Sequence, residues 1–139
     1  MDMSYNPTLM KMGGHMFDNV YVEPSAYHAF LETGTWPDKT RLVLEAREGV
    51  TKGSINKAGM FQSGKPMAVE VHMKDATLPG GWGFFAFGSK EPAARIPEQA
   101  ACYSCHRAHG AVDTTFVQFY PTLLPIAKAK GTVSATYKP

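Results

Sequence analysis

Cysteine is scarce in this sequence: only two occur among 139 residues, so disulfide bonds cannot form the framework of the fold. Long apolar runs are also missing, since no stretch approaches the roughly 20 residues that cross a bilayer. No basic segment followed by an apolar one opens the chain as in a secretory signal peptide. The 14 Lys and Arg are scattered and leave a net charge of only +2. We therefore expect no membrane span and no nucleic-acid partner.

Apolar residues are abundant enough for one hydrophobic core. They make up 44% of the chain and charged residues 19%, which is ordinary for a globular domain. The length predicts a single domain over residues 15–139, preceded by an irregular arm at residues 1–14. No internal repeat or low-complexity segment interrupts it.

Alternating patterns in the first two thirds of the chain predict an antiparallel sheet, and the last third favours helix. Strands are predicted at residues 16–22, 41–47, 67–73 and 82–87. Helices are predicted at residues 25–33, 97–109 and 113–130, the last interrupted by Pro121 and Pro125. The predicted fold class is therefore α+β: an antiparallel β-sheet with a short early helix and a C-terminal helical part.

The alternation also predicts which side chains share a face of the sheet. Leu44 falls on the apolar face of its strand. In the strand at 67–73 we expect Val69 and Val71 to point inward, and Glu70 and His72 to point outward.

Both cysteines belong to one motif, Cys102-Tyr103-Ser104-Cys105-His106, inside the predicted helix at 97–109. Cys-x-x-Cys-His is the attachment signature of c-type haem. Two thiols on one helical turn can reach both vinyl groups of a porphyrin, and the following residue then projects beneath the ring. We therefore predict one covalent haem c per chain, attached through Cys102 and Cys105, with His106 as the axial ligand to iron.

Two other uses of the motif are weaker. A Cys₂His₂ zinc site would also need His109, and the adjacency of Cys105 and His106 makes its geometry awkward. A redox-active Cys-x-x-Cys normally begins a helix after a parallel strand, and the sequence lacks that βαβ pattern.

The other side of the iron decides the function, because a second side-chain ligand suits electron transfer and an open position admits small ligands. His109 would lie on the same side of the ring as His106. The remaining candidates are more typical of surface or core residues: His15, His28, His72, Met67 and Met73. We favour an open position, with a Met-ligated electron carrier as an alternative.

A set of short segments, which includes the motif, is spread over nearly the whole chain. They are Val20-Tyr21-Val22-Glu23-Pro24-Ser25-Ala26-Tyr27, Thr33-Gly34, Trp82 with Phe84 and Phe87, Cys102 to His106, and Phe116 with Phe119-Tyr120-Pro121. As a set they resemble the cytochrome P-460 family, which includes the cytochromes c′-β. The resemblance implies a periplasmic homodimer with a mainly antiparallel β fold and a five-coordinate c-type haem.

The resemblance also implies one of two functions. The P-460 enzymes oxidise hydroxylamine and carry a lysine bonded to the haem edge, whereas the c′-β members lack that bond and bind nitric oxide or carbon monoxide. Counting from the Thr33-Gly34 pair places the lysine position at Leu44, which cannot form the bond. Lys39 and Arg41 cannot replace it without a shift of register. The c′-β function is therefore favoured, and a ligand-binding or electron-transfer protein is expected more than an enzyme.

We accordingly predict an apolar distal pocket that binds nitric oxide and carbon monoxide. Its candidate lining residues are Leu44, Phe61, Val69, Val71 and Phe85, although plain core packing explains most of them equally well. Such a pocket offers no acid or base, so no catalytic residue is assigned. With a different register Glu70 and His72 would supply proton transfer. Because haem attachment takes place outside the reducing cytoplasm, a periplasmic location is expected.

Overall fold

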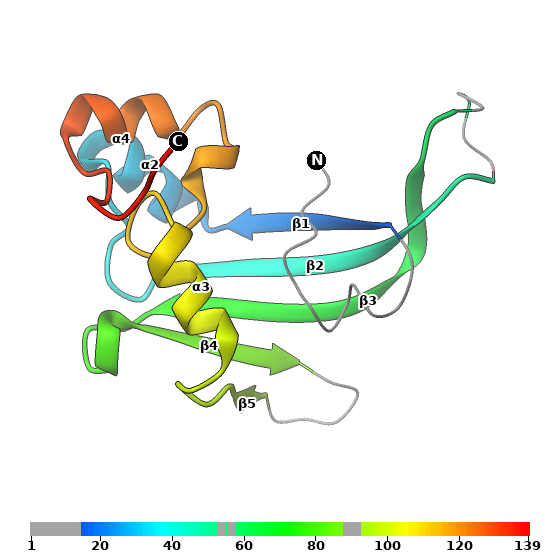
Figure 1. Cartoon of the computed structure of the whole chain (residues 1–139), viewed down its shortest axis with the longest axis horizontal. Coiled ribbons are helices and arrows are strands. Elements are labelled where there is room, and N and C mark those ends of the chain that lie inside the picture. The colour runs from blue at the N-terminus through cyan, green and yellow to red at the C-terminus, as the bar shows by residue number, and fades with distance from the viewer. Residues whose placement is uncertain (1–14, 53–54, 56–57, 88–92) are drawn as a thin grey trace.

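A five-stranded antiparallel sheet forms the centre of the fold, with its strands in the order β1-β2-β3-β4-β5 (Figure 1). The computed structural model describes residues 15–52, 55, 58–87 and 93–139. The strands are β1 (Met16–Val22), β2 (Arg41–Val50), β3 (Phe61–Lys74), β4 (Trp82–Phe87) and β5 (Ala94–Arg95). The described helices are α2 (Pro24–Thr33), α3 (Ala101–His109) and α4 (Leu124–Lys130). The predicted α+β class is confirmed.

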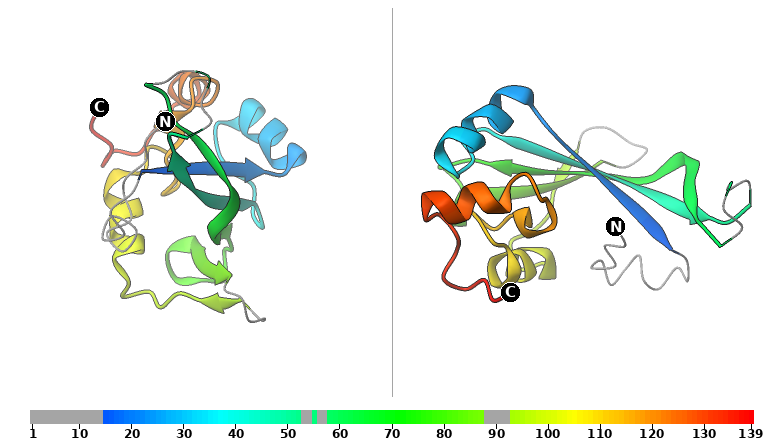
Figure 2. Two further views of the ribbon diagram at one scale, coloured as in Figure 1. Left: turned by 90° about the vertical axis from the view of Figure 1, so that its right-hand side faces the viewer. Right: turned by 90° about the horizontal axis from the view of Figure 1, so that it is seen from above.

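The pairing register fixes which side chains share a face, because residues directly opposite each other point the same way. Leu44 pairs with Glu70, and Glu70 pairs with Ala86. Two residues further along the strands, His72 pairs with Phe84 on the same face. We call this the α3 face, since α3 crosses it in Figures 1 and 2.

The opposite side of the sheet, which we call the outer face, carries the alternate residues. Val43 pairs with Val71, and Val71 pairs with Phe85. The prediction that Leu44 and Arg41 point to opposite faces is confirmed, because Arg41 pairs with Met73 in this second set.

The hydrophobic core lies where the helices meet the end of the sheet. Phe30 of α2 is completely buried, and its ring packs on Trp36 with the centroids 4.4 Å apart. The same cluster includes Trp82 of β4, Ala127 of α4, and Val117, which precedes α4. Helix α2 begins with a proline and ends at Gly34, whose left-handed conformation (φ 77°) lets its N–H donate to the Phe30 carbonyl.

The sequence misjudged the C-terminal helix. Residues 113–130 do not form one interrupted helix. Instead, Asp113 and Thr114 adopt positive φ angles, a single 3₁₀ turn follows at Val117–Phe119, and α4 begins only at Leu124. Strand β4, whose two faces are both apolar, pairs with β3 on one side and with the two-residue β5 on the other. The irregular arm predicted at residues 1–14 lies outside the described residues.

Candidate haem site

Helix α3 places the three motif side chains on one side. Cys102, Cys105 and His106 stand at positions i, i+3 and i+4, which share a face of a helix. All three are half-buried, and the two thiols are free. The helix is fastened to the sheet by Tyr103, whose buried hydroxyl donates to the Ile96 carbonyl (2.9 Å) and accepts from the Phe84 N–H (3.1 Å).

The imidazole of His106 is held in one orientation. Its Nδ1 lies 2.8 Å from the Thr114 carbonyl oxygen, which can only accept, so Nδ1 carries the proton and Nε2 keeps its lone pair. Rings of Phe84 and Phe116 pack against it with centroids 4.7 and 4.3 Å away. Burial lowers the pKa of His106 below its ordinary value, although the hydrogen bond to Thr114 opposes this effect. The ring is therefore neutral at pH 7 and suited to bind a metal.

A second histidine lies against the first. The ring of His72 is stacked on Phe84 at 4.0 Å, and its centroid lies 4.9 Å from that of His106. His72 is buried, and its Nε2 has no hydrogen-bond partner among the described residues. Burial, and secondarily the nearby His106, hold its pKa well below the usual range. The prediction that His72 points outward is wrong, and it forms part of the packing beneath the His106 ring.

Glu70 also lies on the α3 face and not outward as predicted. Its carboxyl is half-buried, and this burial raises its pKa above the ordinary value of 4.5. The same carboxylate lies close enough to Cys102 to affect its thiol. Burial first, and then the negative charges of Glu70 and Cys105, raise the pKa of Cys102. An ionisable group thus stands beside the motif, on the side of the sheet that α3 covers.

The comparison with known families decides the assignment of this site. The family model for cytochrome P460 matches residues 2–117, a range that includes the sheet, the Cys-x-x-Cys-His motif and Thr114. The chain belongs to the cytochrome P460 family. It is therefore a c-type haem protein, which confirms the resemblance found in the sequence. No curated protein matches the chain significantly.

The geometry fits the haem that the cytochrome P460 family implies. The donor set is right for it: two free thiols one helical turn apart and a neutral imidazole with an available Nε2. On the α3 face, the strand positions near Leu44 carry short side chains, namely Ala46, Ala68 and Ala86. When bound, a haem would supply an iron that can change its redox state or bind ligands.

The register separates the pocket residues that the sequence had grouped together. Leu44 lies on the α3 face. Val69, Val71 and Phe85 lie on the outer face, so the structure does not bring them to Leu44. Phe61 begins β3 opposite Val50, at the end of the β2–β3 hairpin far from α3 in Figure 1, and is 40% exposed.

The alternatives considered for the motif gain no support from this cytochrome's geometry. Within residues 15–52, 55, 58–87 and 93–139, no three His, Cys, Asp or Glu side chains are grouped so as to hold a metal ion. Met73, a candidate sixth ligand, lies on the outer face, away from His106. No described helix is long and apolar enough to cross a membrane.

Sequence reasoning missed the residues that position His106. Tyr103 occupies one of the two x positions of the Cys-x-x-Cys-His motif. Thr114 contributes its backbone carbonyl, and a backbone contact cannot be predicted from the residue type. The signal available for Tyr103 was its place on the helix. It lies three residues before His106 and would be expected to point near the same sheet surface.

Proposed function

We propose that this protein is a gas-binding cytochrome that holds a five-coordinate haem and takes up nitric oxide or carbon monoxide. Cys102 and Cys105 would form the two thioether bonds, and His106 would bind the iron. The observation that carries the proposal is the place of Leu44. It stands on the α3 face at the position where the resemblance expects a haem-bonded lysine, and an aliphatic side chain cannot make that bond.

Each residue of the site has a separate task in this function. His106 binds with its Nε2 while Thr114 fixes its Nδ1. Tyr103 keeps α3 on the sheet and so keeps both thiols over the α3 face. Leu44 and Val20, which share this face and are half-buried, offer apolar surface, which suits neutral diatomic ligands because it excludes water without donating or accepting protons.

The ferrous absorption spectrum with and without nitric oxide tests the proposal. We expect the untreated ferrous protein to show a high-spin, five-coordinate spectrum, and nitric oxide to shift its Soret band sharply. Carbon monoxide should shift it as well. A low-spin ferrous spectrum without added ligand would contradict the proposal, because it would mean that a side chain already fills the sixth position.

Hydroxylamine oxidation is the second candidate, and Glu70 is the observation that favours it. Oxidation of an N–H or O–H substrate releases protons, and a half-buried carboxylate with a raised pKa is a suitable acceptor. The resemblance associates this activity with a haem–lysine bond, which Leu44 does not provide. Mass spectrometry of a peptide digest separates the candidates. A peptide digest with a haem-linked lysine would establish the enzyme, and its absence together with nitric oxide binding supports the gas-binding cytochrome.

Glu70→Gln is expected to make the haem-loaded protein more stable at neutral pH. The folded-state pKa of Glu70 is raised above 4.5, so the folded chain holds this proton more tightly than the unfolded chain does. The wild-type protein should therefore lose stability as the pH rises from 4.5 through the folded pKa. The variant should gain up to about 1 kcal/mol at pH 7 and nothing below pH 4, as the cost of a poorly solvated polar group suggests.

Urea unfolding at pH 4 and at pH 7 measures this difference. Glu32→Gln, on the exposed side of α2, serves as the matched control and should change stability by less than about 0.5 kcal/mol at either pH. An equal gain for both variants would show that the burial of Glu70 does not penalise its charge.

The outer face supports the homodimer that the resemblance implies, and we include it in the proposal. A hollow of about 600 Å³ opens there, and its floor carries Val43, Val71 and Phe85. Tyr21 and Phe87 at its sides are 56% and 40% exposed. Exposed aromatic side chains around an apolar hollow are typical of protein interfaces. The Arg41–Glu23 ion pair (2.6 Å) presents both charges at the rim, which suits a two-fold pairing of identical surfaces.

Val71→Glu should convert the dimer to a monomer, because it buries a carboxylate in the middle of this interface. Light scattering coupled to gel filtration should give twice the 15.2 kDa polypeptide mass, plus haem, for the wild type and half of that for the variant. Ala129→Glu, on the exposed side of α4, should leave the mass unchanged. A monomeric wild-type protein would contradict the dimer.

A periplasmic location completes the proposal. Covalent attachment of haem to thiols needs a maturation system outside the reducing cytoplasm, and the two free thiols of α3 are the groups it would modify.

A further inference from the structure

The loop that contacts the axial histidine has a strained backbone. Asp113 and Thr114 follow one another with φ angles of 51° and 61°, a left-handed conformation that is unusual for any residue except glycine and most unfavourable for a β-branched one. The Thr114 hydroxyl is buried and has no hydrogen-bond partner among the described residues. Such strain persists only where the surroundings hold the backbone in place. The strained residue is also the one whose carbonyl accepts from His106.

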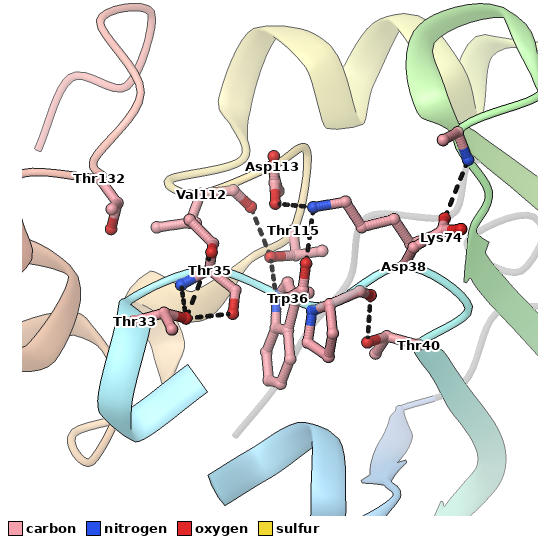
Figure 3. Close-up of polar contacts among 12 residues, drawn as sticks. Thr33, Thr35, Trp36, Asp38, Thr40, Lys74, Val112, Asp113, Thr115 and Thr132 are labelled. Atoms are coloured by element: carbon pink, nitrogen blue, oxygen red, sulfur yellow. Dashed lines mark hydrogen bonds and ion pairs between the residues drawn. The ribbon is translucent and has the colours of Figure 1, made fainter. Parts of the chain in front are cut away.

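An ion pair holds one side of this loop. The ammonium of Lys74, at the end of β3, lies 2.6 Å from Asp113 Oδ2 and also donates to the Trp36 carbonyl at 2.7 Å (Figure 3). The Lys74 and Asp113 side chains are 24% and 32% exposed, so this pair is partly screened from water. The three groups come from β3, from the segment before β2 and from the loop after α3, which joins distant parts of the chain at one point.

A second tether holds the other side. Trp36, which is 3% exposed, donates from Nε1 to Thr115 Oγ1 at 3.0 Å. The Thr115 hydroxyl donates in turn to the Val112 carbonyl at 2.6 Å, and the Thr115 N–H donates to the same oxygen at 2.7 Å (Figure 3). The loop is therefore closed on itself and fixed at both ends of its strained pair.

We propose that Lys74 and Asp113 are positioning residues for the axial histidine. They hold the strained loop so that the Thr114 carbonyl stays within hydrogen-bonding distance of His106 Nδ1. A fixed acceptor at Nδ1 raises the basicity of the imidazole and sets its strength as an iron ligand. This inference rests on His106 being the axial ligand and is independent of which small molecule the iron binds.

Resonance Raman spectroscopy of the ferrous protein tests the inference through the iron–histidine stretching band. Lys74→Met keeps the length of the side chain and removes the ammonium. We expect the band to move to lower frequency and to broaden, because the hydrogen bond from Nδ1 becomes weaker and variable. In the protein without haem, the Nδ1–H proton of His106 should exchange with solvent at least tenfold faster than in the wild type, as measured by nitrogen-15 nuclear magnetic resonance.

Lys39→Met is the matched control. It removes another lysine ion pair, with Asp75 at 2.7 Å, that does not contact the loop, and it should leave the band in place. Asp113→Asn is the second test variant, since asparagine tolerates the left-handed conformation and loses only the charge. It should move the band in the same direction by a smaller amount. A folded, haem-loaded variant of either kind with a wild-type band would overturn the inference. So would the failure of both variants to fold, which would make the pair a requirement of folding.

The outcome is distinguishable from a failure of the proposed function. A shifted band in Lys74→Met together with no response of the wild type to nitric oxide would support the positioning role and refute gas binding. An unshifted band together with a normal nitric oxide response would refute the positioning role and support gas binding.

Discussion

Replacing both Cys102 and Cys105 with serine is expected to abolish covalent haem attachment completely. The hydroxyl of serine does not add to a porphyrin vinyl group under the conditions that join thiols to it, and the sequence has no other cysteine to substitute. The wild-type protein should keep its pigment after denaturation and acid extraction, whereas the double variant should release all of it. Intact mass spectrometry should find the variant at the mass of the bare polypeptide.

The single variants and a neighbouring control sharpen this test. Cys102→Ser and Cys105→Ser should each retain a haem bound by one thioether bond, with a lower yield of mature protein. Ser104→Ala changes the residue between them, whose exposed hydroxyl donates to the Ala101 carbonyl of the same helix. It should leave attachment unchanged and alter stability by less than about 0.5 kcal/mol. A wild-type protein that weighs no more than its polypeptide after maturation would refute covalent attachment.

The sequence predicted the sheet well because short-range alternation is enough to define a strand. The bounds of β1 and β4 agree with the prediction at both ends, and β2 and β3 differ only by being longer. The motif on α3 was equally accessible, since a haem attachment signature depends on residues that are adjacent in the chain. Neither result required knowledge of a distant contact.

Which face of β3 would be covered could not be inferred from the strand itself. Val69 and Val71 are apolar, and Glu70 and His72 are polar, so the pattern predicts that the valines face inward. The structure reverses this assignment because α3 lies over the polar set, where His72 stacks on Phe84 and meets the His106 ring edge-on. The apolar set lies on the outer face, where a partner chain is the proposed cover. An alternating pattern shows that a strand has two different faces, but it does not show which face the rest of the protein covers.

The loop after α3 was mispredicted for a related reason. Residues 113–130 contain enough helix-forming residues to suggest a helix, and Asp113 is a favourable first residue. Its contact with Lys74, 39 residues earlier in the chain, holds it instead in a left-handed conformation. Long-range contacts of this kind override local preference, and here they lie next to His106. The departure from local rules therefore coincides with the candidate haem site.

Gly110→Ala is expected to have the largest effect on the fold of any single substitution near the site. Gly110 adopts an ordinary φ of −67°, so its conformation alone does not exclude a side chain. The space does. An added Cβ would lie 2.6 Å from the carbonyl carbon of Thr114, 2.7 Å from the His106 carbonyl oxygen and 2.8 Å from the Thr114 Cα. All three neighbours are backbone atoms, which cannot swing aside as the end of a side chain can.

The backbone itself must therefore move, and we expect a loss of about 3 kcal/mol of stability, at the upper end of the cost of overpacking. The displaced loop would also carry the Thr114 carbonyl away from His106, so the iron–histidine band should shift as it does in Lys74→Met. Gly64→Ala is the matched control, since no atom lies within 4 Å of its added Cβ and its φ is not positive. Urea unfolding of the two haem-loaded variants makes the comparison. Equal stability would mean that the α3 end and the loop are not in the close contact that fixes His106.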